Sequence, residues 1–295
     1  MKRIRQKSIN LLDEKIQLSI PLYSDESIEL EVLPATPVKS YNGISKFNHI
    51  LIHFGKLLER VKDRKFSYTS KGLFVPDPTK KLDKSILELT DLVNKIDNSI
   101  DKNEQKQLAL EYKKILNQIA KILNKSIEDR LSTSYTFVPL RGGAHVVSAF
   151  QVPFESMIAI DCKRLPLSDG SFAFGMNSPV FDPYDVDRVY KKKVRVVEVC
   201  IASGITSVGI MLDFYAKGCL PEELVFQVLF ASKAGISFIQ EIGKELGVKV
   251  KIYAAKIFNR LGDLTMPYDS IINDKGEKVL GDASAILDLT IDNYK

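Results

Sequence analysis

The stretch that decides the fold is residues 194–209, VRVVEVCIASGITSVG. Its first half is rich in β-branched residues and predicts a buried strand. The small residues that follow predict a tight loop, and the apolar residues beyond them predict a helix. Such a loop directs backbone N–H groups outward, and the start of the helix adds partial positive charge. We therefore expect an anion, most simply a phosphate, to bind at Ala202, Ser203, Gly204, Ile205, Thr206 and Ser207.

Glu198 lies on the predicted strand, ahead of this loop. We expect it to face whatever is attached to the bound phosphate. A carboxylate at this place suits the vicinal hydroxyls of a ribose, because each hydroxyl can donate a hydrogen bond to it. The pattern therefore predicts a site for a sugar 5-phosphate.

From residue 135 onward, short apolar segments alternate with helical ones. The apolar segments are 135–140, 157–161, 194–201, 224–231 and 248–257. This alternation predicts an α/β fold with a mostly parallel sheet flanked by helices. Such sheets bind ligands beyond the carboxyl ends of their strands, so we expect the chemistry in the polar segments that follow these strands.

The first 80 residues have a different pattern. We predict that they form an α+β extension of unknown role, and that residues 81–295 form the main domain. Alternating runs within residues 16–33 predict a hairpin or two edge strands, and the apolar spacing within residues 47–58 predicts a helix. Residues 72–81 are predicted to be a linker. Two amphipathic helices within residues 82–126 would then cover either the sheet or a subunit interface.

Composition limits the class of protein. The chain has 295 residues and 33.2 kDa, which fits one large domain or two unequal ones. Its 42 basic and 37 acidic residues are spread along the chain, so we predict no nucleic-acid binding. The three cysteines lack a CxxC spacing and predict a reducing compartment. No apolar run reaches membrane-spanning length, and we expect a cytoplasmic protein without a membrane partner.

His49 and His53 are four residues apart on the helix predicted within residues 47–58. That spacing can present two imidazoles on one helix face, as metal sites require. No third ligand is near them in the sequence. We therefore predict no metal held by protein side chains.

Three further polar segments follow predicted strands. Arg141 and Gly142 follow the first, where an arginine beside glycines can bind an anion or can simply form a tight turn. Lys163 and Arg164 open a polar excursion of about 30 residues, which suits an active-site flap or a disordered loop. The last segment ends near Asp282, in a turn that either reads a flat heterocycle and holds a proton or is a plain surface hairpin.

Together these residues resemble the type I phosphoribosyltransferases, and within them the uracil phosphoribosyltransferases. The phosphoribosyl pyrophosphate (PRPP) signature of the family, an acid followed by Ala-Thr-Gly-x-Ser/Thr, is matched in spacing by residues 196–206. The resemblance covers about residues 130–290. It is also carried by four shorter motifs: LRGG at residues 140–143, ASKAGI at 231–236, IYAA at 252–255 and GDA at 281–283.

The resemblance implies transfer of a 5-phosphoribosyl group from PRPP to a nucleobase, with release of pyrophosphate. It implies that the phosphate loop holds the 5-phosphate and that Glu198 holds the ribose hydroxyls. Arg141 and Gly142, with Lys163 or Arg164, would bind the pyrophosphate, and Asp282 in a hood would assist the base. Magnesium would be carried by substrate oxygens and water. A homodimer or higher homo-oligomer is also implied.

The sequence departs from the family pattern in several places. Glu198 replaces the usual Asp, and Ser203 replaces the usual Thr. The Tyr-Arg-Asp-Glu of the family's flap is absent, and no second Gly-Asp-Arg follows Ala283. Uracil is the first candidate base, with its identity open. Two alternatives stand beside catalysis: a non-catalytic sensor that keeps the phosphate site, and an effector acting on a nucleotide, whose N-terminal region recruits a partner.

Overall fold

The computed structural model describes most of the chain from residue 69 onward and three short strands before it. The described residues are 16–21, 27–32, 50–53, 69–76, 80–127, 133, 135–140, 142–166, 172–177, 189–216, 219–265, 268–272, 275, 278–280, 286–287 and 289–290. Within these ranges, no helix is long and apolar enough to cross a membrane.

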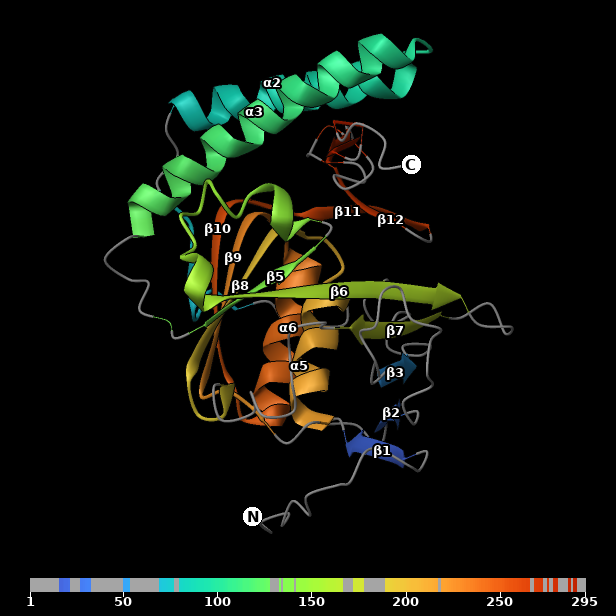
Figure 1. The fold of residues 1–295 in the computed structure, drawn as a ribbon, viewed down its shortest axis with the longest axis vertical. Helices are drawn as coiled ribbons and strands as arrows, with labels where there is room; N and C mark the ends of the chain where they lie inside the picture. The colour runs from blue at the N-terminus through green and yellow to red at the C-terminus, as the bar shows by residue number, and fades with distance from the viewer. Residues whose placement is uncertain are drawn as a thin grey trace.

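A parallel sheet forms the centre of the molecule (Figure 1). Its six strands in spatial order are β6 (Met157–Pro166), β5 (Tyr135–Pro139), β8 (Lys193–Ile201), β9 (Glu223–Ser232), β10 (Lys249–Phe258) and β4 (Leu73–Phe74). Each hydrogen-bonds to its neighbour in parallel register. The predicted α/β fold is confirmed, because every segment predicted as a strand from residue 135 onward lies in this sheet.

Helices cover both faces of the sheet. On one face, α5 (Ile205–Ala216) and α6 (Lys233–Leu246) pack on side chains that include Val196 and Phe226. On the other face, α2 (Lys80–Asn98) and α3 (Lys102–Ile127) pack on side chains that include Val197 and Leu229. Val196 and Val197 belong to different cores because successive residues of a strand point to opposite faces.

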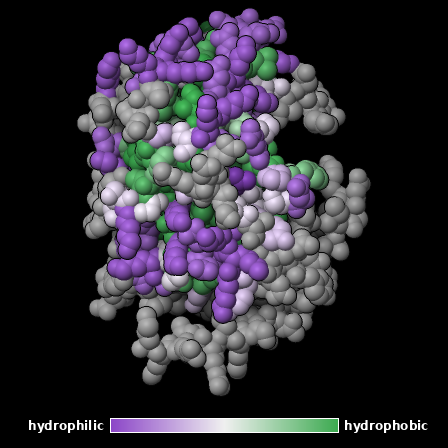
Figure 2. Space-filling view, turned by 90° about the vertical axis from the view of Figure 1, so that its left-hand side faces the viewer, coloured by the Kyte–Doolittle hydropathy of each residue, from purple (hydrophilic) through white to green (hydrophobic). Residues whose placement is uncertain are grey.

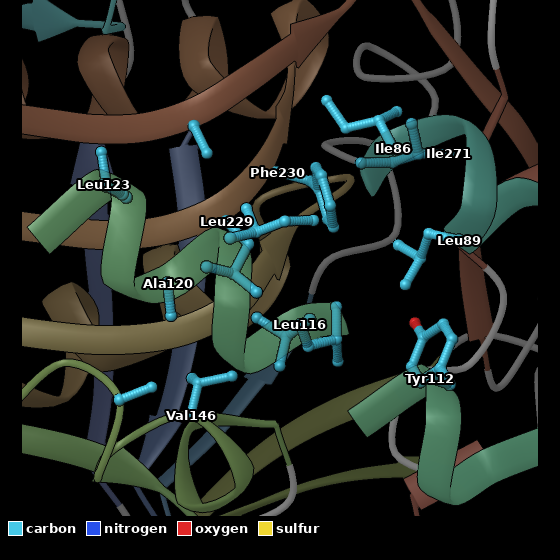
Figure 3. Close-up of a cluster of buried hydrophobic side chains, with 14 of the residues drawn as sticks. Ile86, Leu89, Tyr112, Leu116, Ala120, Leu123, Val146, Leu229, Phe230 and Ile271 are labelled. Carbon is cyan, nitrogen blue, oxygen red and sulfur yellow. The ribbon is translucent and has the colours of Figure 1, made fainter. Parts of the chain in front are cut away.

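The predicted amphipathic helix pair therefore covers the sheet. Leu116, Ala120 and Leu123 of α3 belong to one buried cluster with Leu229 and Phe230 of β9, and Figure 3 shows these residues together. The outer surface of the pair, at the top of Figure 2, is mainly hydrophilic. Residues three and four apart supply the buried stripe on each helix, which is the pattern from which the helices were predicted.

Four antiparallel strands extend the sheet beyond β6. In spatial order they are β7 (Phe172–Asn177), β3 (Ile50–His53), β2 (Ser27–Val32) and β1 (Ile16–Pro21). The hairpin predicted within residues 16–33 is confirmed, with Ile16 paired to Val32. The sheet is thus mostly parallel, with an antiparallel extension formed by the N-terminal strands and β7.

The helix predicted within residues 47–58 is wrong over residues 50–53, which form β3. Three consecutive apolar residues, Ile50 to Ile52, satisfy a helix and a short buried strand equally well. The partners of this strand are not adjacent in sequence, because Ile52 pairs with Leu30 of β2 on one edge and with Phe174 of β7 on the other. The helical spacing proposed for the two histidines does not apply at His53, while His49 lies outside the described residues. No cluster of three or more metal-ligating side chains occurs in the described ranges.

The linker predicted at residues 72–81 is also partly wrong. Leu73 and Phe74 form β4, an edge strand paired with Ile252 and Tyr253 of β10. The Gly72 carbonyl accepts a hydrogen bond of 2.8 Å from Ile252 N–H. Gly72 has a φ of +76°, a conformation that glycine adopts without steric cost. Two residues are too few for a periodic signal, so this strand could not be predicted from local pattern.

A small antiparallel sheet follows β10 toward the C-terminus. It contains β11 (Arg260–Thr265), β12 (Tyr268–Ile272) and β13 (Lys278–Leu280). β13 lies against α2, so this sheet stands on the same side of the molecule as the helix pair (Figure 1). It occupies the position in the chain where the sequence predicted a hood.

A buried polar chain links α3 to the sheet. Arg195 of β8 is only 6% exposed, and its Nε and Nη1 donate to Thr136 (3.0 Å) and Gln227 (3.1 Å). Gln227 Nε2 donates in turn to Asn124, in the last turn of α3, at 3.3 Å. Burial lowers the pKa of Arg195 to about 10. The buried charge therefore lowers the free energy of unfolding by its full amount below about pH 10. This destabilisation decreases as the pH rises from about 10 toward the ordinary pKa of an arginine, because the folded protein releases the proton first.

We expect Gln227→Leu to lower the free energy of unfolding by about 3 kcal/mol, because Arg195 Nη1 and Asn124 Oδ1 both lose the hydrogen bond that Gln227 provides. The double variant Arg195→Met, Gln227→Leu should lose less than the single variant, since it removes the buried charge as well. Urea unfolding of both variants measures the difference. A double variant that loses as much stability as Gln227→Leu, or more, would contradict this account.

Candidate functional site

The candidate site lies where the parallel strands end. β8 ends at Ile201 and continues through residues 202–204 into α5, while β9 ends at Ser232 and runs directly into α6. The turn after β5 contains Gly142 and Gly143, which open a short 3-10 helix. Two of the predicted polar segments, those after β5 and β8, therefore begin at one edge of the sheet beside the end of β9, as expected for neighbouring parallel strands.

The loop after β8 is shaped by Gly204. Its φ of +84° is in the left-handed region that favours glycine. Val208 N–H donates to the Gly204 carbonyl at 2.9 Å and closes the first turn of α5. Among the described residues, no acceptor is found for the N–H groups of Thr206 and Ser207, which belong to the open first turn. The loop thus presents backbone donors at the positive end of a helix.

Exposure within the loop is uneven. Ala202 and Thr206 are partly exposed, whereas Ser203 and Ser207 are only 1% and 5% exposed. Ser203 Oγ accepts a long hydrogen bond of 3.5 Å from Ile205 N–H. Ala202 and Thr206 are therefore the residues of this loop that are most open to solvent, and the two serines are almost inaccessible to it.

Glu198 contacts the turn after β5. Its Oε1 accepts a hydrogen bond of 2.9 Å from Val199 N–H, and the side chain is partly buried. A Cβ added to Gly142 would overlap this carboxylate, and a Cβ added to Gly143 would overlap the Val197 carbonyl. The two strands thus bring the predicted ribose carboxylate and the predicted pyrophosphate turn into contact. The backbone contact requires a glycine at 143, whereas a side chain at 142 would force the Glu198 carboxylate to move.

We expect Gly142→Ala to lower the free energy of unfolding by about 1–3 kcal/mol, because the new methyl group displaces the Glu198 carboxylate. Ala144→Ser, at the exposed position two residues later, is the control and should change it by less than about 0.5 kcal/mol. In a Glu198→Ala background, Gly142→Ala should cost much less, since the obstacle is gone. Equal losses in both backgrounds, measured by urea unfolding, would contradict the contact.

Of the remaining predicted site residues, the structure describes the backbones of Lys163 and Arg164. Lys163 and Arg164 lie on β6, where their backbones pair with Gly175 and Phe174 of β7. Within the predicted flap, residues 163–166 of β6 therefore pair antiparallel with residues 172–175 of β7, beyond the last residue at which β6 pairs with β5, Ile160. Arg141 and the turn that contains Asp282 lie outside the described residues.

Ser232 and Gly235 were not among the predicted site residues, although both lie against the phosphate loop. Ser232 caps α6, and its Oγ accepts from Gly235 N–H at 2.9 Å. The same hydroxyl donates to the Ala202 carbonyl. A serine at the end of an apolar strand, just before a helix, is a capping signal that sequence reasoning could have used. Its contact with a loop 30 residues earlier has no local signal.

Comparisons with known proteins give only distant similarities. No protein-family model and no curated protein matches the chain. Among solved structures, a protein of Aquifex aeolicus shares 16% identity with a TM-score of 0.47, over 73% of this chain and 97% of that protein.

Two of the other similar structures have named activities. Orotate phosphoribosyltransferase of Mycobacterium tuberculosis, solved with PRPP, shares 14% identity over 58% of this chain and 89% of its own, with a TM-score of 0.33. Adenine phosphoribosyltransferase of Trypanosoma brucei shares 11% sequence identity, over 64% of this chain and 86% of its own, with a TM-score of 0.37. At these values the function has to be argued from the residues of the site.

Proposed function

We propose that the chain binds PRPP and transfers its 5-phosphoribosyl group to a nucleobase. The observation that carries this proposal is the arrangement on β8. One strand presents a partly buried carboxylate, Glu198, and then a glycine-shaped loop whose N–H groups stand at the start of α5. A carboxylate suits ribose hydroxyls and a helix start suits a phosphate, so together they match a ribose 5-phosphate.

Each group would have a separate task in the reaction. Backbone N–H groups and Thr206 would hold the 5-phosphate, and Glu198 would fix the ribose through its hydroxyls. Arg141, the Gly142 backbone and Lys163 or Arg164 would neutralise the leaving pyrophosphate. Displacement at the anomeric carbon develops positive charge on the sugar, so positioning and charge stabilisation would provide most of the catalysis.

Magnesium would enter with the substrate. Within the described ranges, no cluster of three or more acids, histidines or cysteines could hold the ion by itself. Phosphate oxygens and water are the ligands that magnesium prefers when it accompanies a nucleotide or diphosphate.

The acceptor is the less constrained part of the proposal. Uracil is the first candidate, and Asp282 is the residue proposed to assist it. Incubation with PRPP, magnesium and isotopically labelled bases, one at a time, tests this directly. Labelled nucleotide from uracil is expected, and tight PRPP binding with no product from any common base would overturn the transferase proposal.

One observation favours a second candidate, a non-catalytic sensor. β7, in the segment predicted to be a flap, pairs with β3 of the N-terminal region, where Ile52 is opposite Phe174. A strand held on both edges has less freedom to close over a substrate than a free loop. A sensor would be stabilised against heat by PRPP or a nucleotide but would give no turnover.

A further inference from the structure

The Ser232 hydroxyl links the start of α6 to the loop between β8 and α5. Its side chain is fully buried, at 0% exposure. The Oγ accepts from Gly235 N–H at 2.9 Å, which caps α6, and it donates to the carbonyl of Ala202 in the phosphate loop. A hydroxyl has one hydrogen to donate, and here that hydrogen is directed at the loop. The cap of one helix is thus tied to the loop before the other.

Gly204 and Gly235 form a second contact between the same segments. A Cβ on Gly204 would lie 2.9 Å from the Gly235 carbonyl oxygen and 3.2 Å from its Cα. A Cβ on Gly235 would overlap the Ala202 carbonyl and lie 3.1 Å from Gly204 N. The two backbones therefore touch with no side chain between them. The first turn of α6, at residues 232–235, thus packs directly against the loop at residues 202–204.

We infer that Ser232 and Gly235 are positioning residues for the phosphate loop. The inference rests on the proposed function, because it assigns a role in holding the ligand's 5-phosphate. The Ser232 hydroxyl fixes the Ala202 carbonyl, and the Gly235 backbone limits how far the loop can move toward α6. These two restraints set the direction of the N–H groups that follow, up to Val208, whose N–H closes the first helical turn on Gly204.

Replacing Ser232 with alanine tests the hydroxyl. It leaves the N–H of the buried Gly235 and the carbonyl of Ala202 without this partner, so we expect about tenfold weaker binding of ribose 5-phosphate. The Val208 amide should exchange with deuterium about tenfold faster in the ligand-free protein, because the turn it closes is less restrained. Ser232→Thr keeps the hydroxyl and should bind within about threefold of wild type.

Ser237→Ala is the matched control. Ser237 lies on the same helix, is 1% exposed, and its hydroxyl donates to the Lys233 carbonyl of its own helix at 2.8 Å. Its loss should lower the melting temperature without changing Val208 exchange or ligand affinity. Gly235→Ala provides a second variant that keeps the serine cap but pushes on the Ala202 carbonyl, and we expect it to weaken binding as Ser232→Ala does.

The outcomes separate the two claims. A wild-type protein that does not bind ribose 5-phosphate would overturn the proposed function. If the wild type binds and Ser232→Ala has the affinity and Val208 exchange of Ser237→Ala, then the positioning role is wrong while the proposed function stands. Faster exchange and weaker binding in Ser232→Ala and Gly235→Ala, but not in Ser237→Ala, would support the inference.

Discussion

Gly204→Val is expected to remove measurable binding of PRPP and ribose 5-phosphate, a loss of more than about a hundredfold. Two effects act at this position. The φ of +84° is strained for a β-branched residue, and a Cβ there would press on the Gly235 backbone at 2.9 Å. The loop must move to relieve both, and its N–H groups then lose their common direction. Isothermal titration calorimetry measures the loss.

Gly247→Val is the control for backbone strain. Gly247 ends α6 with a φ of +70°, and nothing lies within 4 Å of a Cβ placed there. This variant carries a similar conformational cost far from the loop, so it should lose stability and keep its affinity. Gly204→Ala is the milder companion and should bind measurably but more weakly than wild type. Wild-type affinity in Gly204→Val would show that the loop is not the phosphate site.

Glu198→Ala is expected to weaken PRPP and ribose 5-phosphate binding by about a hundredfold. Two hydrogen bonds from ribose hydroxyls to a carboxylate, each contributing roughly 1.5 kcal/mol, account for a loss of that size. Affinity for inorganic phosphate should change little, because the backbone donors of the loop remain. Competition titrations with the three ligands separate the ribose contribution from the phosphate contribution.

Glu222→Gln is the control for a general loss of negative charge. Glu222 is exposed and pairs with Lys249 at 3.2 Å, outside the site. It should leave all three affinities unchanged. An equal loss for inorganic phosphate and for ribose 5-phosphate in Glu198→Ala would assign Glu198 to the shape of the Gly142 turn and not to the sugar.

The central fold could be predicted because its signals are local. The run from Val194 to Ile201 is long, apolar and β-branched, and it forms β8 as expected. The buried stripes on α2 and α3 repeat over about four turns or more, and both helices occur where they were predicted. The sequence left open whether the pair covers the sheet or a subunit interface. Ala120 of α3 and Leu229 of β9 belong to one buried cluster, so the pair covers the sheet.

The errors arose where a distant partner decides the structure. Residues 50–53 form β3 because β2 and β7 offer them hydrogen-bonding edges, the second more than 100 residues later in the chain. Leu73 and Phe74 form β4 for the same reason, with β10 as the partner. A window of sequence contains no information on such pairing, and short apolar runs fit a helix, a strand or a loop equally well.

In the candidate site, too, the features with a local sequence signal were predicted, and those that depend on contacts between strands were not. The loop from Ala202 to Ser207 and its glutamate were predicted from spacing along one strand and helix, and the structure places them at the carboxyl end of β8. The support from Ser232 and the contact of Gly142 with Glu198 join different strands. They depend on which strands are neighbours, which only the assembled sheet determines.

The most direct test of the account is a calorimetric titration of the wild-type protein with PRPP in the presence of magnesium, repeated with Gly204→Val. The account predicts saturable binding with one PRPP per chain by the wild type and no detectable binding by the variant. Absence of binding by the wild type, or equal binding by both proteins, would contradict a phosphoribosyl site on the loop after β8.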